Sequence, residues 1–152
     1  MNAIELLIAD HEAVEELFQQ VEGSDATEHP ELFRQIKLSL EAHAHIEESI
    51  FYPSLQEDGD EALVELTSEA LKEHSQAKVA IGELAAVAAD TEKFEPLLAK
   101  LMEDVRHHVA EEEGEMFPAV AEQFDDETLE KWGSQMETEK DRFQESAESA
   151  YA

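Results

Sequence analysis

Apolar residues that recur at alternating steps of three and four are the feature that most limits the folds open to this chain. In residues 2–22 they are Ile4, Leu7, Val14, Phe18 and Val21, with His11 at the same spacing. This spacing places all six side chains on one stripe of an α-helix. Glycine and proline number only 5 and 4 in 152 residues, too few to interrupt many turns. The pattern therefore predicts an all-α fold.

The same periodicity predicts four more helices. One runs from near Pro30 to the acidic, glycine-containing segment 57–60, and the next from Asp60 to about Asp90. A further helix begins between Thr91 and Pro96 and either ends near Pro118 or kinks there and continues to Phe124, and a narrow apolar edge follows in residues 125–152. Short connections make consecutive helices antiparallel neighbours. We therefore expect an up-down-up-down four-helix bundle in residues 1–124. The additional C-terminal helix, residues 125–152, would pack on the bundle or on a partner subunit.

Four of the seven histidines lie on the core-facing stripes, one on each of the first four helices: His11, His43, His74 and His108. Their distances along the chain to the connections between helices are nearly equal. Because a helix rises about 1.5 Å per residue, antiparallel packing would bring the four imidazoles into one layer. A single core histidine is usually satisfied by a hydrogen bond, but four in one layer indicate a shared ligand.

Two glutamates, Glu47 and Glu112, follow His43 and His108 by one helical turn on the same stripes. Buried without partners, the carboxylates and imidazoles would be strongly destabilising, and a pair of cations resolves this better than a purely hydrogen-bonded network. Imidazole and carboxylate donors suit iron, manganese or zinc, and the chain has no cysteine. Two bridging carboxylates and a bridging oxygen would give each metal about five ligands. A sixth position would then be open to O2, peroxide, NO or water.

The remaining histidines do not follow the core periodicity. We expect His29, in a loop, and His45 and His107, beside the stripes, to be solvated, although His45 or His107 could hydrogen-bond to a ligand. Glu48 and Glu113 flank the stripe glutamates and could orient the ligands in the same way.

An internal repeat links the two halves of the chain. Asp10-His11 is followed by HAHIEESIFYP at 43–53, and Glu73-His74 by HHVAEEEGEMFP at 107–118. With these motifs, residues 1–124 resemble the hemerythrin family in its bacterial hemerythrin-like (HHE cation-binding) branch. The resemblance implies an up-down four-helix bundle around an oxo- or hydroxo-bridged pair of iron ions, with manganese or zinc less expected. The implied ligands are His11, His43, Glu47, His74, His108 and Glu112, with the two glutamates as bridges.

The sequence departs from the oxygen-carrying hemerythrins at two ligand positions. Lys78 stands where those carriers have a fifth histidine, and Glu112 follows His108 by four residues where they have an aspartate after five. The resemblance thus favours a redox reaction, sensing or iron handling over reversible O2 carriage. We expect a non-heme di-iron protein that binds or reacts with O2, peroxide or NO. Whether it is an oxidase, peroxidase or catalase-like enzyme is left open. A non-enzymatic iron sensor or store and a metal-free interaction bundle are the alternatives.

The charge balance restricts the partners. Lys and Arg total 10 against 39 acidic residues, a formal net charge of −29. Such a surface repels nucleic acids and anionic membranes. There is no basic N-terminal region and no apolar run of membrane-spanning length, so we expect a cytoplasmic protein without a membrane partner. We expect it to be a monomer or a weak homodimer.

Overall fold

A computed structural model describes the backbone of residues 1–151 and the side chains of residues 1–147, and every regular element in that part is helical. The α-helices are α1 (Ala3–Glu22), α2 (His29–Ile46), α3 (Tyr52–Asp58), α4 (Glu61–Ala86), α5 (Thr91–Glu111), α6 (Phe117–Gln123) and α7 (Asp126–Tyr151). A 3-10 turn, η1 (Ala26–Glu28), precedes α2. Two π-helical turns are inserted between α-helices, η2 (Glu47–Phe51) and η3 (Glu112–Met116). The all-α prediction is confirmed.

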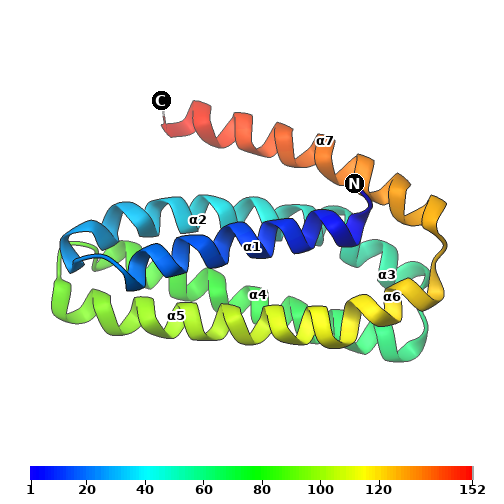
Figure 1. The fold of residues 1–152 in the computed structure, drawn as a ribbon, viewed down its shortest axis with the longest axis horizontal. Coiled ribbons are helices and arrows are strands. Elements are labelled where there is room, and N and C mark those ends of the chain that lie inside the picture. Colours follow the sequence, from blue (N-terminus) through cyan, green and yellow to red (C-terminus); the bar gives the residue numbers. More distant parts are fainter. Residues whose placement is uncertain (152) are drawn as a thin grey trace.

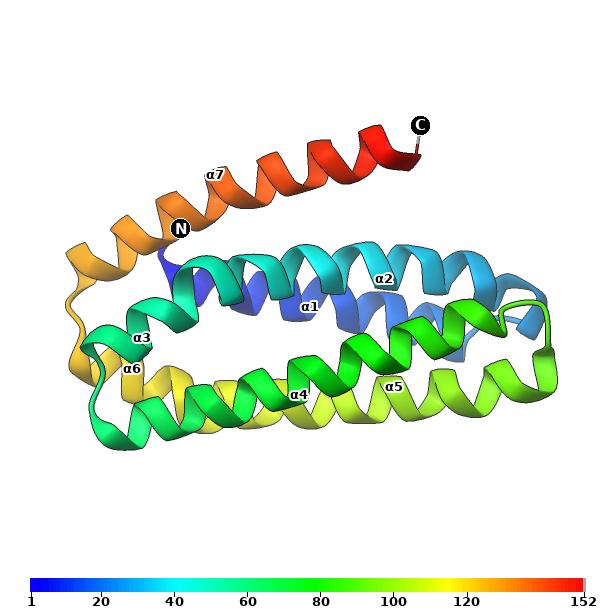
Figure 2. The same ribbon diagram turned by 180° about the vertical axis from the view of Figure 1, so that it is seen from behind.

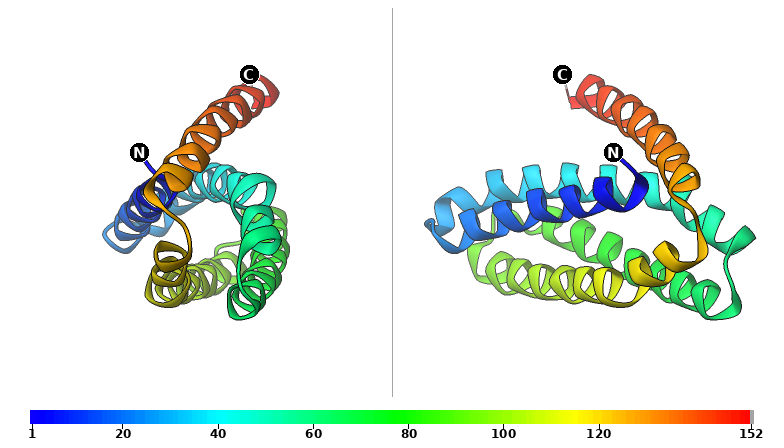
Figure 3. Two further views of the ribbon diagram at one scale, coloured as in Figure 1. Left: turned by 90° about the vertical axis from the view of Figure 1, so that its right-hand side faces the viewer. Right: turned by 45° about the vertical axis from the view of Figure 1, so that its right-hand side comes forward.

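The helices form two hairpins and an overlying helix. α2, η2 and α3 follow one another without a break, as do α5, η3 and α6, so each set forms one long curved rod. The first hairpin pairs α1 with α2 and the second pairs α4 with α5; Figures 1 and 2 show them as two layers. α7 returns over α1 and α2, and its beginning lies beside the N-terminus (Figure 3). None of the described helices is both long and apolar enough to cross a membrane.

Acidic or amide side chains cap several helix starts. Asn2 accepts from the backbone N–H of Glu5, whose carboxylate accepts from the Asn2 N–H in return, a reciprocal capping box. Asp60 caps α4 at Leu63, and Asp125 accepts from the Thr128 N–H at the start of α7. These caps satisfy N–H groups that have no partner within the helix.

The π turns explain why the second and fourth rods continue past a proline. The backbone N–H of Tyr52 bonds to the Glu47 carbonyl and that of Phe117 to the Glu112 carbonyl, a spacing of five residues. A proline one position further cannot donate to the carbonyl four residues before it, and its ring would clash there. The wider turn accommodates Pro53 and Pro118 in rods that continue to Asp58 and Gln123. Both turns begin at a glutamate predicted to bind metal.

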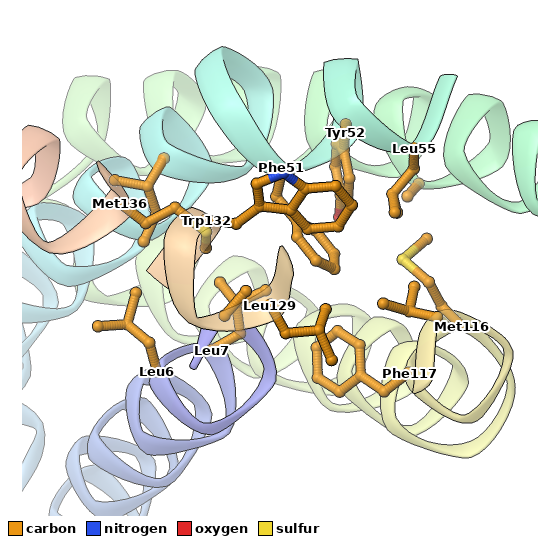
Figure 4. Close-up of a cluster of buried hydrophobic side chains, with 14 of the residues drawn as sticks. Leu6, Leu7, Phe51, Tyr52, Leu55, Met116, Phe117, Leu129, Trp132 and Met136 are labelled. Carbon is orange, nitrogen blue, oxygen red and sulfur yellow. The ribbon is translucent and has the colours of Figure 1, made fainter. Parts of the chain in front are cut away.

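Two apolar clusters lie at opposite ends of the hairpins. One cluster joins α1, η2, α3, α4, α6 and α7 and includes Leu7, Phe51, Tyr52, Leu55, Phe117, Trp132 and Met136 (Figure 4). The other joins α1, α2, α4 and α5 and includes Phe18, Phe33, Ile36, Leu84, Phe94 and Leu98. α7 contributes Leu129, Trp132 and Met136 to the first cluster. At Gly133 a Cβ would collide with the backbone of residues 1–3, so glycine permits α7 to cross the N-terminus closely. The predicted histidine layer lies between the two clusters.

Candidate metal centre

The six side chains predicted to bind metal come together between the two apolar clusters. Each of the four long helices contributes one histidine, and each π turn begins with one glutamate: His11 from α1, His43 from α2, Glu47 from η2, His74 from α4, His108 from α5 and Glu112 from η3. The glutamates are almost fully enclosed, with 0% exposure for Glu47 and 2% for Glu112. Two charged carboxylates inside a protein need strong partners.

The side chains fall into two groups, each able to hold one ion. His11, His43 and Glu112 form one group, and Glu47, His74 and His108 form the other; within each, one atom per residue lies within 4.8 Å of the others. The carboxylates also connect the groups. Glu47 Oε1 lies 3.0 Å from His43 Nε2 and 3.1 Å from His74 Nε2. Glu112 Oε1 lies 3.1 Å from His11 Nε2, and its Oε2 lies 3.4 Å from His108 Nε2. Each carboxylate therefore occupies a position suited to bridging two ions.

These short separations are not hydrogen bonds. The inward nitrogens of His11, His43 and His108, both Glu47 oxygens and Glu112 Oε1 are buried without a hydrogen-bond partner. Two ligands at adjacent corners of an octahedron with metal–ligand distances of about 2.1 Å lie about 3.0 Å apart, since the edge is √2 times that distance. The atoms are thus spaced like ligands that converge on a shared ion, and the residues fit the pair of metals implied by the sequence.

A carboxylate on the outer side holds each histidine ring. Asp10 lies 2.9 Å from His43 Nδ1 in the first hairpin, and Glu73 lies 2.7 Å from His108 Nδ1 in the second. Since a carboxylate accepts, Nδ1 carries the proton and the Nε2 lone pair is directed toward the centre. Asp10 and Glu73 were not predicted in this role. The repeated acid–histidine dipeptide was a signal, but each acid contacts the histidine of the neighbouring helix.

The other two outer carboxylates cross between hairpins. Glu113 of η3 lies 2.7 Å from Nδ1 of His11, and Glu48 of η2 lies 2.8 Å from Nδ1 of His74. The expectation that Glu48 and Glu113 contact the ligand histidines agrees with this geometry. Each hairpin therefore orients one histidine of the other.

The buried charges shift one another's proton affinity. Burial alone would lower the pKa of His43, but Glu47 and Asp10 outweigh it and hold that pKa well above its usual value. The same competition, with Glu112 as the main acid, raises the pKa of His108 to about 9. Burial would raise the pKa of Glu47, but His43 and His74 bring it well below its usual range. These opposite shifts of the histidine and glutamate pKa values arise from imidazoles and carboxylates packed together out of water, and a cation would compete with protons for the same atoms.

Tyr52 adds a hydroxyl that the sequence analysis missed. Its O–H donates to Glu112 Oε2 over 2.5 Å and lies 3.4 Å from His74 Nε2. Burial, together with the negative charges of Glu47 and Glu112, raises the pKa of Tyr52 well above its usual value. Phe117 occupies the matching place in the other half, stacked on His11 with ring centroids 5.9 Å apart. The signal was present in the repeat, where FYP in one half corresponds to MFP in the other.

A cavity of about 530 Å³ adjoins the ligand layer. Its walls include the four ligand histidines and the apolar side chains of Val14, Leu40, Ala77, Ile81 and Val105. Lys78, at the place of the missing fifth histidine, also lines it, but its ammonium is paired with Glu48 at 2.7 Å and its side chain is 60% exposed. The cavity offers room for a small ligand beside the candidate metal positions.

The three other histidines differ in their surroundings. The prediction that His29 is a solvated loop residue is wrong. It begins α2, is buried, and bonds to Glu95 at 2.8 Å and to the Val21 carbonyl at 2.8 Å, because the end of α1 and the start of α5 both pack against it. His45 is half-buried against α7, where it contacts Glu139 and Phe143. His107 is exposed and pairs with Glu111, as expected.

Comparison with known proteins gives one family. The sequence model described as the hemerythrin HHE cation binding domain matches residues 2–120. A crystal structure of a hemerythrin HHE cation binding domain-containing protein from Mycobacterium kansasii aligns with a TM-score of 0.83 and 26% identity, covering 97% of this chain and 90% of that one.

A curated relative has a different description. The protein named DNA nickase from Nostoc sp. (strain PCC 7120) is 29% identical over 149 residues, which is 95% of this chain but only 41% of the relative. The chain thus spans less than half of that protein's length. With the family match covering most of its residues, the chain belongs to the hemerythrin HHE cation-binding domain family.

Proposed function

We propose that the protein binds two iron ions between the two hairpins and reacts there with O2, peroxide or NO. The observation that carries the proposal is the set of inward-facing, unpartnered donor atoms in two groups, with a glutamate between the groups on each side. The ligands would be His11, His43, Glu47, His74, His108 and Glu112. The architecture on which the proposal rests is the antiparallel four-helix bundle expected from the sequence, with α7 added to it.

The donor set supports iron. Imidazole and carboxylate ligands without sulfur disfavour copper(I) and are typical of iron, manganese and zinc. Two histidines and two bridging carboxylates leave each ion short of six ligands, a coordination suited to a metal that binds an exogenous molecule. When bound, the iron pair would supply the electrons exchanged with the oxidant.

The chain's own residues would prepare the site in three ways. The outer carboxylates fix the ring orientation of the histidines, so that the Nε2 lone pairs are already directed inward. The hydroxyl oxygen of Tyr52 lies 2.5 Å from Glu112 Oε2, so its proton can be shared with an acceptor in the layer. Val14, Ile81 and Val105 give the adjoining cavity apolar wall beside the ligand histidines. Because Asp10, Glu41, Glu48, Glu73 and Asp104 also line this cavity, a small uncharged oxidant fits it better than an anionic substrate.

An activity on DNA receives no support from the described site. The match covers only 41% of the relative with that name, so more than half of that protein has no counterpart here. The formal net charge of −29 also opposes the approach of this chain to a polyanion. We propose that the chain acts without nucleic acid, as a monomer or a weak homodimer.

The test is metal content and reaction after anaerobic loading with Fe(II). We expect two irons per chain, with Mössbauer spectra of a coupled pair, and a change in visible absorption on adding O2 or hydrogen peroxide. Glu112→Gln should retain one iron or fewer. Glu115→Gln, an exposed neighbour in the same π turn, is the matched control and should retain two.

Fewer than two irons in the unaltered protein, or full loading of Glu112→Gln, would contradict the proposal. Repeated peroxide turnover at constant iron content would identify an enzyme. Stable, reversible spectra would identify a carrier or sensor.

A further inference from the structure

The helix α7 reaches from outside the bundle to the layer of ligand histidines. The ammonium of Lys140 lies 2.5 Å from Asp10 Oδ1. Next to it, Glu139 Oε1 lies 2.9 Å from His45 Nε2, and the Phe143 ring stacks on His45 with centroids 4.6 Å apart. The family match ends at residue 120, before α7 begins at Asp126. These contacts therefore come from a segment outside the matched domain.

Lys140 and His43 contact the two oxygens of one buried carboxylate. Asp10 is 8% exposed; its Oδ1 accepts from Lys140, and its Oδ2 accepts from His43 Nδ1 at 2.9 Å. A buried carboxylate with one oxygen unsatisfied is costly, so Asp10 depends on both partners to stay in this orientation. The chain of contacts runs from α7 through Asp10 to the imidazole of His43.

The matching carboxylate in the second hairpin has different neighbours. Glu73 contacts His108 Nδ1 at 2.7 Å but lies beside His107 and Glu111, and its side chain is 21% exposed. Water can replace a lost partner of Glu73 more easily than one of the enclosed Asp10. The contact with Lys140 thus matters more for Asp10, where less solvent is available to replace it.

We propose that Lys140 is a positioning residue through which the docking of α7 is coupled to metal occupancy at the position formed by His11 and His43. Without its ammonium, Asp10 turns toward water to satisfy Oδ1, and His43 loses the acceptor that orients its ring. Conversely, a metal ion that fixes His43 also fixes Asp10 in the orientation that accepts from Lys140. Coupling of this kind is reciprocal, so metal binding must tighten α7 by as much as α7 tightens metal binding. The inference rests on the proposed metal binding.

The first test measures affinity with Zn(II), which is diamagnetic and needs no oxidant. Removing an outer carboxylate partner of a metal-bound histidine typically weakens binding about 10–100-fold, and Lys140 acts one contact further out. In the full-length protein we therefore expect Lys140→Met to weaken one of two zinc sites about tenfold. Lys140→Arg, which keeps the charge, should restore most of it. Lys131→Met, an exposed lysine of α7, should leave both sites unchanged.

The second test follows the contact itself by nuclear magnetic resonance. In zinc-loaded protein, the Nδ1–H proton of His43 should exchange with water faster in Lys140→Met, whereas that of His108 should be unchanged. A general loss of packing would affect both protons. Amide exchange in residues 136–143 of the unaltered protein should slow on adding zinc, and this slowing should disappear in Lys140→Met.

The outcomes separate the two proposals. If the unaltered protein binds neither zinc nor iron, the proposed function fails, and the coupling with it. If it binds two ions but Lys140→Met has the same affinities and the same His43 exchange, only the coupling is wrong. Should Lys140→Met fail to fold, zinc-independent exchange of α7 in the unaltered protein would overturn the coupling.

Discussion

The two hairpins carry the same ligand pattern but different surroundings. Each has an acid before its first histidine, a glutamate one turn after its second, and a π turn ahead of a proline. They differ at Tyr52, whose position in the repeat corresponds to Phe117 in the second hairpin. They also differ at Asp10, which is paired with Lys140, whereas the corresponding Glu73 lies beside Glu111. The comparison teaches that the repeated residues determine where the donor atoms lie, whereas the unmatched residues Tyr52 and Lys140 determine which hydrogen bonds and charges surround them. Two metal ions bound here would have similar ligands but different charged and hydrogen-bonding groups around those ligands.

The largest effect should come from Glu47 and Glu112, the glutamates proposed to bridge the two ions, where the halves match most closely. Glu47→Gln should reduce iron to one ion or fewer per chain, and by as much as Glu112→Gln, because each carboxylate lies between both groups of ligands. Metal analysis after anaerobic loading measures this. If one variant kept both ions while the other lost them, the carboxylates would not be equivalent bridges.

The next effect should come from the unmatched tyrosine. Tyr52→Phe makes the halves alike and removes the hydroxyl whose oxygen lies 2.5 Å from Glu112 Oε2. Positioned proton donors typically contribute about 10²–10⁴-fold. We expect oxidation of the iron-loaded protein by peroxide to slow at least about tenfold at unchanged iron content, measured by stopped-flow absorption. An unchanged rate would show that Tyr52 serves only packing. Phe117→Tyr is the reciprocal change and should not rescue it, since Phe117 stacks on His11.

A smaller effect should appear in the pH dependence of the metal-free protein. His108 has a folded pKa of about 9 against an ordinary 6.5, so its stabilising contribution is complete below pH 6.5 and is lost as the pH rises through 9. Glu47, with a pKa well below its ordinary 4.5, stabilises above that value and loses its effect as the pH falls further. The melting temperature should therefore fall between pH 6.5 and 9.5. Zinc should abolish this fall, and a flat profile without metal would contradict the assigned charges.

The smallest effect should come from Lys78, which sharpens the contrast with Lys140. Both lysines pair with an outer carboxylate, but Lys78 is 60% exposed and Glu48 can be solvated in its absence. Exposed ion pairs contribute about 0–1 kcal/mol. Lys78→Met should change zinc affinity by less than about threefold, as measured by competition with a chelator. If Lys78→Met lost as much zinc affinity as Lys140→Met, the burial of the carboxylate would not explain the difference expected between the two lysines.

Periodicity and spacing predicted the helices and the six side chains that meet in the layer, because both depend on residues within one helix. The outer contacts were harder to predict. Asp10 contacts the histidine of the neighbouring helix rather than its sequence neighbour, and Lys140 lies 130 residues away from its carboxylate. The buried position of His29 was missed for the same reason, since Glu95 belongs to the other hairpin. Such contacts depend on how the rods rotate and cross, which no local spacing specifies.

The exchange of outer carboxylates between hairpins has a mechanical consequence. Glu113 holds His11 across the interface in one direction and Glu48 holds His74 in the other, so sliding one hairpin along its partner would break both contacts at once. Two metal ions bound in the layer would be ligated by residues of both hairpins and so would join the same interface. The metal would then act as a cross-link against shear, and its removal would loosen the interface between hairpins before either hairpin opened.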